Sequence, residues 1–572
     1  MFENATLSVT YLKDGKNFST VLSNDDIKIT SEQKDGVFNL FINTSSPVNI
    51  TEICLVKKYD FPECAAFFGN GYQSWTDTKE YKKTDRMRDL GAVGKDISKF
   101  QFWQRLCGVN GSSFFQSKTP TPMGSIFLGA GDYSFVKYDR RRKGYFHSLS
   151  YTYIRNGANY TLIGSLNERN GYTVFYADMD ANTIRIEKDL EGVTVNGSYH
   201  VFSLFTAEGG YDEVFDAYFK KIGAKARTQK YLKGYTSWYN YYTNISEEII
   251  LRDLEALSKA APEINAFQID DGYQTDVGDW LSVDPNKFPN GMKPIADAIH
   301  KKGLKAGIWL APLGAKLGSK TLKEHPDWFI KNPDGTPRVM GPNWGGFCGL
   351  NFYLPEVRSH IKHFFDVILN DWGYDLVKLD FLYAASVVPL NNKSRAENMF
   401  DAMEFIRECV KDKEILGCGV PIMPCVNQVE YMRIGADMGL SWSQSIYGMT
   451  THREDVNTRN AIHNGLNRRH LNRRVFLNDP DVFLLRDYNI RFSPAQRNLL
   501  AKLIKITGGV LFTSDDVNRY NDEQKALLSY MLRDADIKID DVDFDKNIYT
   551  VSYTENSEKK TLKFSLFNGK VY

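Results

Sequence analysis

The stretch Asp375-Leu-Val-Lys-Leu-Asp-Phe381 decides the fold. Its apolar run has the length of one buried strand, and it ends on a polar residue, Asp380, where a loop would begin. Seven further runs of this kind occur between residues 234 and 513, mostly separated by helical segments: 234–238, 266–270, 306–310, 415–418, 431–434, 475–478 and 509–513. Eight strands over roughly 280 residues predict a (β/α)8 barrel.

Only a loop separates the fifth run from the sixth, so one barrel helix is expected to be missing or degenerate. A doubly wound open sheet is the alternative. A polar residue at nearly every strand end favours the closed barrel, because side chains at the carboxyl ends of its strands face one common site.

The regions on either side of the barrel have a different pattern of apolar and polar residues. The N-terminal region alternates apolar and polar residues between turn signals such as Asn156-Gly157, which predicts an antiparallel β-sandwich. A helix with Phe215, Phe219 and Ile222 on one face is expected to follow it. The predicted fold class is multidomain α/β, with a β-sandwich over 1–205, a helical linker over 206–230, the barrel over 231–534 and a small antiparallel β-domain over 535–572.

Composition excludes several functional classes. A formal net charge of +1 in 572 residues offers no basic surface for nucleic acid. No run of about 18 apolar residues occurs, so no membrane span is expected. The start of the chain has no secretory signal pattern, and the seven cysteines have no CxxC spacing, which together predict a cytoplasmic protein with reduced thiols. The nine histidines show no HxH or HExxH spacing, so no metal site is expected.

The residues at the predicted strand ends are mainly acidic and aromatic: Trp238, Asp270, Asp271, Trp309, Lys378, Asp380, Cys418, Arg433, Asp437 and Asp479. Asp380 and Asp437 each close an apolar run. Two carboxyls presented from neighbouring strand ends are what hydrolysis of a glycosidic bond requires. The adjacent carboxylates Asp270 and Asp271 could bind sugar hydroxyls through charge-assisted hydrogen bonds, although an Asp-Asp-Gly turn explains them equally well.

Two cations accompany the carboxyl pair. Lys378 and Asp380 are two apart on one strand and point to the same face, so Lys378 is expected to lower the pKa of Asp380. A purely structural ion pair at the barrel mouth is the other reading. Arg433 would lie beside Asp437 after the Gly435-Ala436 step. Since a general acid must hold its proton, either the charge of Asp380 outweighs Arg433 or Arg433 serves Asp380 instead.

A series of motifs then matches a known family. They are Phe267-Gln-Ile-Asp-Asp-Gly272, Gly278-Asp-Trp280, Gly307-Ile-Trp-Leu-Ala-Pro312, His325-Pro-Asp-Trp328, Lys378-Leu-Asp-Phe381, Gly417-Cys-Gly419, Met432-Arg-Ile-Gly-Ala-Asp437 and Asn478-Asp-Pro-Asp481. In this order the chain resembles an α-galactosidase of glycoside hydrolase family 36, in its short bacterial or archaeal form. The match covers about 230–520, and Gly71-Tyr-Gln-Ser-Trp75 extends it into the N-terminal domain.

The resemblance implies a retaining double displacement on an oligosaccharide or glycoconjugate, with no metal and no cofactor. Asp380 falls on the nucleophile and Asp437 on the acid/base. The other implied site residues bind the sugar or line the pocket: Trp75, Asp270, Asp271, Trp309, Lys378, Cys418 and Arg433. Longer members have Cys-Ser-Gly-Gly where this chain has Gly417-Cys-Gly-Val-Pro421, and this departure affects the surroundings of the sugar 2-position.

Three alternatives stay open at this point. An α-N-acetylgalactosaminidase would need room for a 2-acetamido group near Cys418 and Gly419. An aldolase could use Lys378 as a Schiff-base lysine, which would leave the aspartate pair without a role. A carbohydrate-binding module would explain the aromatic residues and the Asp270-Asp271 pair, but not Asp380 and Asp437. Oligomeric state and linkage preference do not follow from the sequence.

Overall fold

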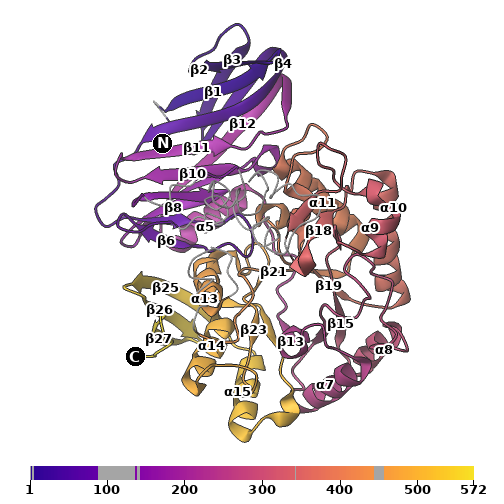
Figure 1. Ribbon diagram of the computed structural model, residues 1–572. Helices are drawn as coiled ribbons and strands as arrows, with labels where there is room; N and C mark the ends of the chain where they lie inside the picture. The colour runs from indigo at the N-terminus through magenta and orange to yellow at the C-terminus, as the bar shows by residue number, and fades with distance from the viewer. Residues whose placement is uncertain (1, 3–4, 88–134, 138–141, 342, 443–456) are drawn as a thin grey trace, which may run out of the picture.

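The computed structural model describes residues 2, 5–87, 135–137, 142–341, 343–442 and 457–572. Figure 1 shows a β-domain formed by the N-terminal part of the chain, a barrel with helices around its strands, and a small C-terminal sheet beside helices α13 and α14. The predicted multidomain α/β fold class is confirmed.

The N-terminal β-domain is antiparallel, and its twelve described strands hydrogen-bond into one continuous sheet. Its strands are β1 (Thr6–Lys13), β2 (Lys16–Thr20), β3 (Ile27–Lys34), β4 (Val37–Lys58), β5 (Ala66–Gly69), β6 (Lys79–Lys82), β7 (Tyr145–Leu149), β8 (Tyr151–Asn156), β9 (Asn159–Ser165), β10 (Thr173–Asp178), β11 (Thr183–Lys188) and β12 (Thr194–Gly209). Side chains alternate between the two faces of a strand. Phe67 thus packs into the domain's own core, while Phe68 joins the core shared with the barrel.

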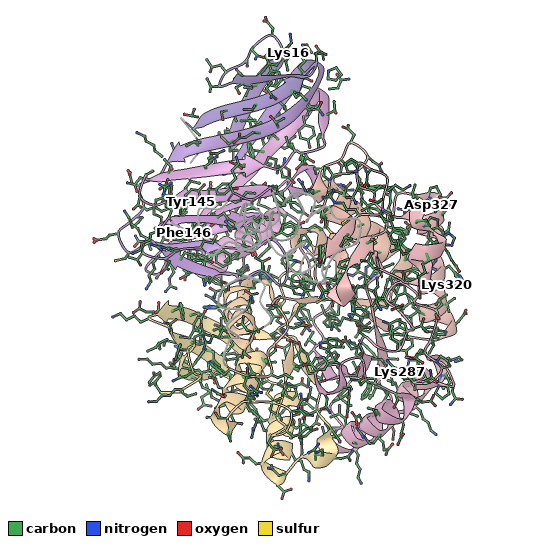
Figure 2. The ribbon with its side chains drawn as sticks, viewed as in Figure 1. Lys16, Tyr145, Phe146, Lys287, Lys320 and Asp327 are labelled. Atoms are coloured by element: carbon green, nitrogen blue, oxygen red, sulfur yellow. The ribbon has the colours of Figure 1, made fainter. Side chains whose placement is uncertain are left out.

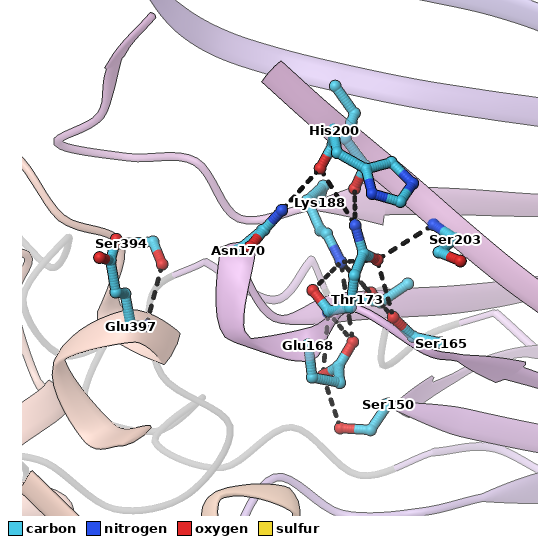
Figure 3. Close-up of polar contacts among 12 residues, drawn as sticks. Ser150, Ser165, Glu168, Asn170, Thr173, Lys188, His200, Ser203, Ser394 and Glu397 are labelled. Atoms are coloured by element: carbon cyan, nitrogen blue, oxygen red, sulfur yellow. Dashed lines mark hydrogen bonds and ion pairs between the residues drawn. The ribbon is translucent and has the colours of Figure 1, made fainter. Parts of the chain in front are cut away.

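A buried polar cluster lies within this domain (Figure 3). The ammonium group of Lys188, with a side chain 0% exposed, donates to Thr173 Oγ1 at 2.8 Å and to Asn167 Oδ1 at 3.1 Å. Its nearest carboxylate oxygen is on Glu168, 3.9 Å away, and Glu168 also accepts a hydrogen bond from Ser150. Because every charged group in the cluster has polar partners, the domain tolerates their burial.

Helix α5 (Tyr211–Lys221) connects the β-domain to the barrel. Phe215 and Phe219 are buried on one face, as predicted, and the ring of Phe215 stacks on His470 with centroids 3.9 Å apart. His470 is fully buried between the hydroxyls of Tyr151, at 2.8 Å, and Tyr211, at 2.9 Å. The β-domain, the linker helix and the barrel therefore share one hydrophobic core.

The barrel strands run parallel and enclose a core of Val, Ile, Leu and Phe. In sheet order they are β22 (Leu477–Asp479), β21 (Tyr431–Arg433), β20 (Glu414–Gly417), β19 (Leu376–Leu379), β15 (Lys305–Leu310), β14 (Ala266–Ile269), β13 (Leu232–Thr236), β24 (Val510–Thr513) and β23 (Val482–Phe483). The surrounding helices include α7 (Glu247–Ala260), α8 (Lys293–Lys301), α10 (Pro355–Asp366), α11 (Arg395–Val410), α13 (Thr458–Asn467) and α14 (Pro494–Thr507). Between β20 and β21 only a short 3-10 turn (Met423–Cys425) occurs, as the sequence indicated.

The seventh strand position of the barrel is divided in two. β22 pairs with β21, and β23 pairs with β24, while Pro480 and Asp481 interrupt the strand between them. Asp481 has φ +82°, a left-handed conformation that a non-glycine residue seldom adopts. Asp481 therefore belongs to neither β22 nor β23.

The chain ends with helix α15 (Asp522–Leu532) and the antiparallel strands β25 (Ile537–Asp545), β26 (Ile548–Glu555) and β27 (Glu558–Ser565). The six described cysteines are free thiols, and Cys107 lies outside the described residues. Within the described ranges, none of the helices has the length and hydrophobicity of a bilayer span.

Candidate active site

Asp380 lies at the carboxyl end of β19, in the centre of the barrel mouth, and is 9% exposed. Each of its carboxylate oxygens has a donor. The indole N–H of Trp309 reaches Oδ2 at 3.2 Å, and the backbone N–H of Phe381 reaches Oδ1 at 2.9 Å. Phe381 has φ +52°, a strained conformation for an aromatic residue that aims this N–H back at the carboxylate. The carboxylate is thus held in one orientation.

The electrostatics of Asp380 differ from the sequence prediction. Burial raises the pKa of Asp380 above its ordinary value, and the nearby Asp437 adds to this, whereas Lys378, Cys418 and Trp309 oppose it only in part. Lys378 does act to lower this pKa, as predicted, but the prediction of a lowered net pKa was wrong. The physical reason is that desolvation outweighs the cation, which is committed to another carboxylate.

That carboxylate is Asp270. Lys378 Nζ, on β19, lies 2.8 Å from Oδ2 of Asp270, which follows β14 on the other side of β15, and both side chains are at least 93% buried, with exposures of 7% and 3%. Asp270 Oδ2 also accepts from Gln268 Nε2 at 2.8 Å and from Thr236 Oγ1 at 3.1 Å. The ammonium group of Lys378 has a raised pKa, with Asp270 as the main cause opposing desolvation. A lysine that forms a Schiff base needs a lowered pKa, so the raised pKa of Lys378 argues against an aldolase.

Asp271 faces a different set of partners. Its Oδ1 accepts from Gln274 Nε2 at 2.6 Å and its Oδ2 from the indole N–H of Trp344 at 3.3 Å. Burial raises the pKa of Asp271 to about 6. The turn that follows is held by Lys287, labelled in Figure 2, which donates to the carbonyl of Gly272 at 3.0 Å. Asp271 is therefore a buried carboxyl group that accepts hydrogen bonds from two side chains.

Asp437 reaches the mouth from the loop after β21, as predicted. Its Oδ1 lies 2.9 Å from Arg433 Nη1, and its side chain is 38% exposed, compared with 3% for Arg433. Arg433 also contacts two buried carboxylates, Asp479 through Nε at 3.0 Å and Asp481 through Nη2 at 3.0 Å. The guanidinium is thus shared among three acids, and neither sequence interpretation of Arg433 anticipated this.

The N-terminal domain contributes one wall. The indole N–H of Trp75 donates to Cys418 Sγ at 3.4 Å, and its ring packs edge-on against Phe381 with centroids 5.0 Å apart. The loop that presents Trp75 is tied down by Arg468, whose guanidinium donates to the carbonyls of Ser74 at 2.6 Å and Gln73 at 2.9 Å. The structure therefore brings together all nine residues that the sequence predicted for the site.

Sequence reasoning missed Trp344, and it named Asp481 only as the end of a family motif, with no role in the site. Trp344 is half-buried, has φ +57°, and packs on Phe381 with centroids 4.5 Å apart. The Asn343-Trp-Gly-Gly346 segment offered a turn signal that could have pointed to it. Trp238, expected at a strand end, instead begins helix α6 (Trp238–Tyr241) and contacts Tyr242. No cluster of three or more metal-ligating side chains occurs among the residues that the structure describes.

This fold is similar to that of TtGalA, an α-galactosidase from Thermus thermophilus solved in complex with p-nitrophenyl α-D-galactopyranoside. The TM-score is 0.70 at 23% identity, and the match covers 96% of this chain and 98% of that one. Another structure of TtGalA is a complex with stachyose. At this level of identity the likeness establishes the fold.

Two curated relatives match shorter segments. One is an A type blood alpha-D-galactosamine galactosaminidase from Flavonifractor plautii, 32% identical over 149 residues, which are 25% of this chain and 14% of the relative. The other is an alpha-galactosidase from Escherichia coli, 28% identical over 178 residues, or 30% of this chain and 24% of the relative. The aligned segments thus span less than a quarter of the length of either relative.

The fold and the site together define a (β/α)8-barrel protein with a cluster of carboxyl side chains at the carboxyl ends of its strands. Residues 214–406, which include β13 to β19 and most of α11, match the family model described as Melibiase. This part of the chain is therefore similar to the melibiase family, in agreement with the resemblance that the sequence motifs indicated.

Proposed function

We propose that this protein is a retaining α-galactosidase that releases terminal α-linked galactose. The observation that carries the proposal is the pairing of a fully oriented, buried carboxylate, Asp380, with a second carboxyl, Asp437, that is 38% exposed to the pocket mouth. In this mechanism Asp380 attacks the anomeric carbon while Asp437 protonates the leaving oxygen. Asp437 then removes a proton from the water that releases galactose.

The other residues have roles that follow from their contacts. Trp309 and the Phe381 N–H hold the nucleophile so that one oxygen can approach the sugar. Asp271, whose two partners leave acceptor capacity, is suited to bind a sugar hydroxyl. Asp270, saturated by three donors on one oxygen, orients Lys378 at the floor of the pocket.

The substrate preference rests on the wall beside Cys418. A Cβ added to Gly419 would lie 2.7 Å from Trp75 Cζ2 and 2.8 Å from the Phe381 nitrogen, so the wall packs tightly at this position. A 2-acetamido group needs room near Cys418 and Gly419, and this packing therefore favours galactose. The similarity to the Flavonifractor plautii galactosaminidase keeps α-N-acetylgalactosaminidase as the second candidate.

The test is a comparison of p-nitrophenyl α-galactoside with p-nitrophenyl α-N-acetylgalactosaminide. We expect hydrolysis of the first at a kcat/KM at least tenfold higher, since each 1.4 kcal/mol of lost fit is about tenfold. An NMR time course is expected to show α-galactose as the first product. Faster hydrolysis of the acetamido sugar would support the second candidate, and β-galactose as first product would overturn the double displacement.

A further inference from the structure

Asp481 is the most deeply buried acid near the pocket mouth, and no step of the proposed mechanism uses it. Its side chain is 0% exposed, and it lies in the interruption between β22 and β23 with φ +82°. A buried carboxylate is costly unless its partners compensate it, and a left-handed non-glycine residue adds strain. Because Asp481 has both a buried carboxylate and a left-handed backbone, we looked for a function of this residue in its contacts.

The contacts of Asp481 lead to Asp437 by two routes. Through Oδ1, Asp481 forms an ion pair with Arg433 Nη2 at 3.0 Å, and Nη1 of the same guanidinium donates a hydrogen bond to Asp437 Oδ1 at 2.9 Å. Through Oδ2, Asp481 accepts the backbone N–H of Met438 at 2.7 Å. Met438 is the residue directly after Asp437, so one carboxylate holds both the side-chain partner and the backbone of Asp437.

A third contact fixes Asp481 itself. The hydroxyl of Tyr239, which is buried at the start of the barrel, donates to Asp481 Oδ2. The backbone N–H of Asp481 donates to Asp479 Oδ1 at 2.9 Å. The charged and titratable groups facing Asp481 are thus Arg433, Asp437, Asp479 and Tyr239.

The charge count explains why this arrangement suits an acid/base. One guanidinium faces three carboxyl groups, and two of them, Asp479 and Asp481, are buried with exposures of 5% and 0%. These two buried carboxylates compensate the positive charge of Arg433. Arg433 can then orient Asp437 through Nη1 while its own positive charge is balanced by the two buried carboxylates.

We propose that Asp481 is a positioning residue that sets the orientation and the charge environment of Asp437 through Arg433 and the Met438 backbone. This inference rests on the proposed function, because it assigns Asp437 the acid/base role. It predicts a defect in proton donation to the leaving group, distinct from a general loss of folding.

The experiment uses Asp481→Asn in the full chain, assayed with methyl α-galactoside and p-nitrophenyl α-galactoside. The amide keeps the shape and one acceptor oxygen but removes the charge. We expect kcat/KM for the methyl glycoside, a poor leaving group, to fall about 10- to 100-fold more than for the nitrophenyl glycoside, because misplacement of a catalytic group by about 1 Å costs on the order of 10²-fold.

Two further variants complete the design. Asp253→Asn is the matched control, because Asp253 is also buried and accepts from the hydroxyls of Tyr235 at 2.9 Å and Tyr241 at 2.8 Å, but contacts neither Arg433 nor Asp437 in the structure. For Asp253→Asn, kcat/KM is expected to change by the same factor for the two substrates. Tyr239→Phe removes only the hydroxyl donor to Asp481, so it replaces Asp481→Asn if that variant fails to fold. We expect its kcat/KM for the methyl glycoside to fall a few-fold more than its kcat/KM for the nitrophenyl glycoside, and we call such a difference between the two substrates a split.

The outcomes separate the two proposals. If Asp437→Ala shows a large split between the two substrates while neither Asp481→Asn nor Tyr239→Phe shows one, the positioning role of Asp481 is overturned and the proposed function stands. If the unaltered protein hydrolyses neither galactoside, or Asp437→Ala shows no split, the proposed function itself fails. A split in Asp481→Asn and none in Asp253→Asn supports the inference.

Discussion

The indole N–H of Trp75 donates a hydrogen bond to the sulfur of Cys418 at 3.4 Å, although 343 positions separate the two residues along the chain. Cys418 follows β20 of the barrel, and Trp75 belongs to a loop of the N-terminal β-domain. The backbone of that loop also bonds to the barrel, with Ser74 N–H donating to Val420 O at 3.0 Å. The N-terminal domain is therefore part of the pocket wall.

The tight contact at Gly419 gives the first prediction. Gly419→Ala places a Cβ 2.7 Å from Trp75 at a position with φ +55°. Overpacking of this kind costs about 1–3 kcal/mol in addition to the left-handed strain of about 1 kcal/mol. We expect a lower free energy of unfolding and a drop in kcat/KM of at least tenfold, measured by urea denaturation and nitrophenyl galactoside hydrolysis.

Gly303→Ala is the control for that experiment. Gly303 has φ +76°, and an added Cβ would meet nothing within 4 Å. It carries the same kind of backbone strain with no contact to the pocket, so only the smaller loss of stability is expected. Equal effects of the two substitutions on kcat/KM would argue against a role for the Trp75 wall.

Under the proposed mechanism, substitutions of Asp380 and Asp437 are expected to impair hydrolysis in different ways. Asp380→Ala abolishes turnover for every leaving group, because no covalent intermediate can form. Asp437→Ala slows poor leaving groups by about 10²–10⁴-fold but spares nitrophenolate, which departs with little protonation. Steady-state kinetics with the two galactosides measure the difference.

Azide identifies which carboxyl is which. Added to Asp437→Ala, azide attacks the galactosyl-enzyme from the side where Asp437 stood, which is the side that water uses, and yields α-galactosyl azide. With Asp380→Ala, azide enters from the side of the missing nucleophile, displaces the leaving group of the α-galactoside with inversion, and yields the β-azide or no product. NMR of the products decides, and the reverse assignment would mean that the nucleophile and the acid/base are interchanged.

Asp271 links the pocket to the pH dependence of stability. Its pKa of about 6 lies above the ordinary 3.8, so the folded state binds this proton more tightly than the unfolded state does. Stability is therefore lost as pH rises through the window from about 4 to about 6. At 1.36 kcal/mol per pH unit, the loss amounts to at most ~3 kcal/mol at neutral pH.

Asp271→Asn is expected to remove this loss. The variant gains stability at pH 7.5 but not at pH 4, while galactose binding weakens because a charged acceptor is gone. Urea denaturation at the two pH values is the measurement. Asp297→Asn, at an exposed position paired with Lys293 on α8, is the control and leaves the pH slope unchanged. An unchanged slope in Asp271→Asn would contradict the assignment.

The buried pair in the N-terminal domain gives a prediction about stability alone. Burial lowers the pKa of Lys188 to about 8, yet removing the ammonium leaves Glu168 buried without its cation. We expect Lys188→Met and Glu168→Gln each to cost about 3–5 kcal/mol. The double variant costs less than the sum, as thermal unfolding of all four proteins can show. Additive losses would mean that the two groups do not interact.

The sequence by itself determined the order of the elements and the position of the pocket. Period-2 alternation identified the terminal β-domains, and short apolar runs ending on polar residues identified the barrel strands. These patterns are local, and a parallel barrel converts them into a site because its strand ends converge. This is why Asp380, Asp437, Asp271 and Trp309 could be found without coordinates.

Only the tertiary structure decided which of these groups pair. Lys378 and Asp380 share a strand face, yet the ammonium group reaches Asp270 on another strand, at 2.8 Å. Trp75 joins Cys418, and Asp481 shares Arg433 with Asp437, through contacts that no sequence spacing encodes. The physical reason is that desolvation and partner choice depend on what the folded chain packs around each charge, and this environment comes from distant segments.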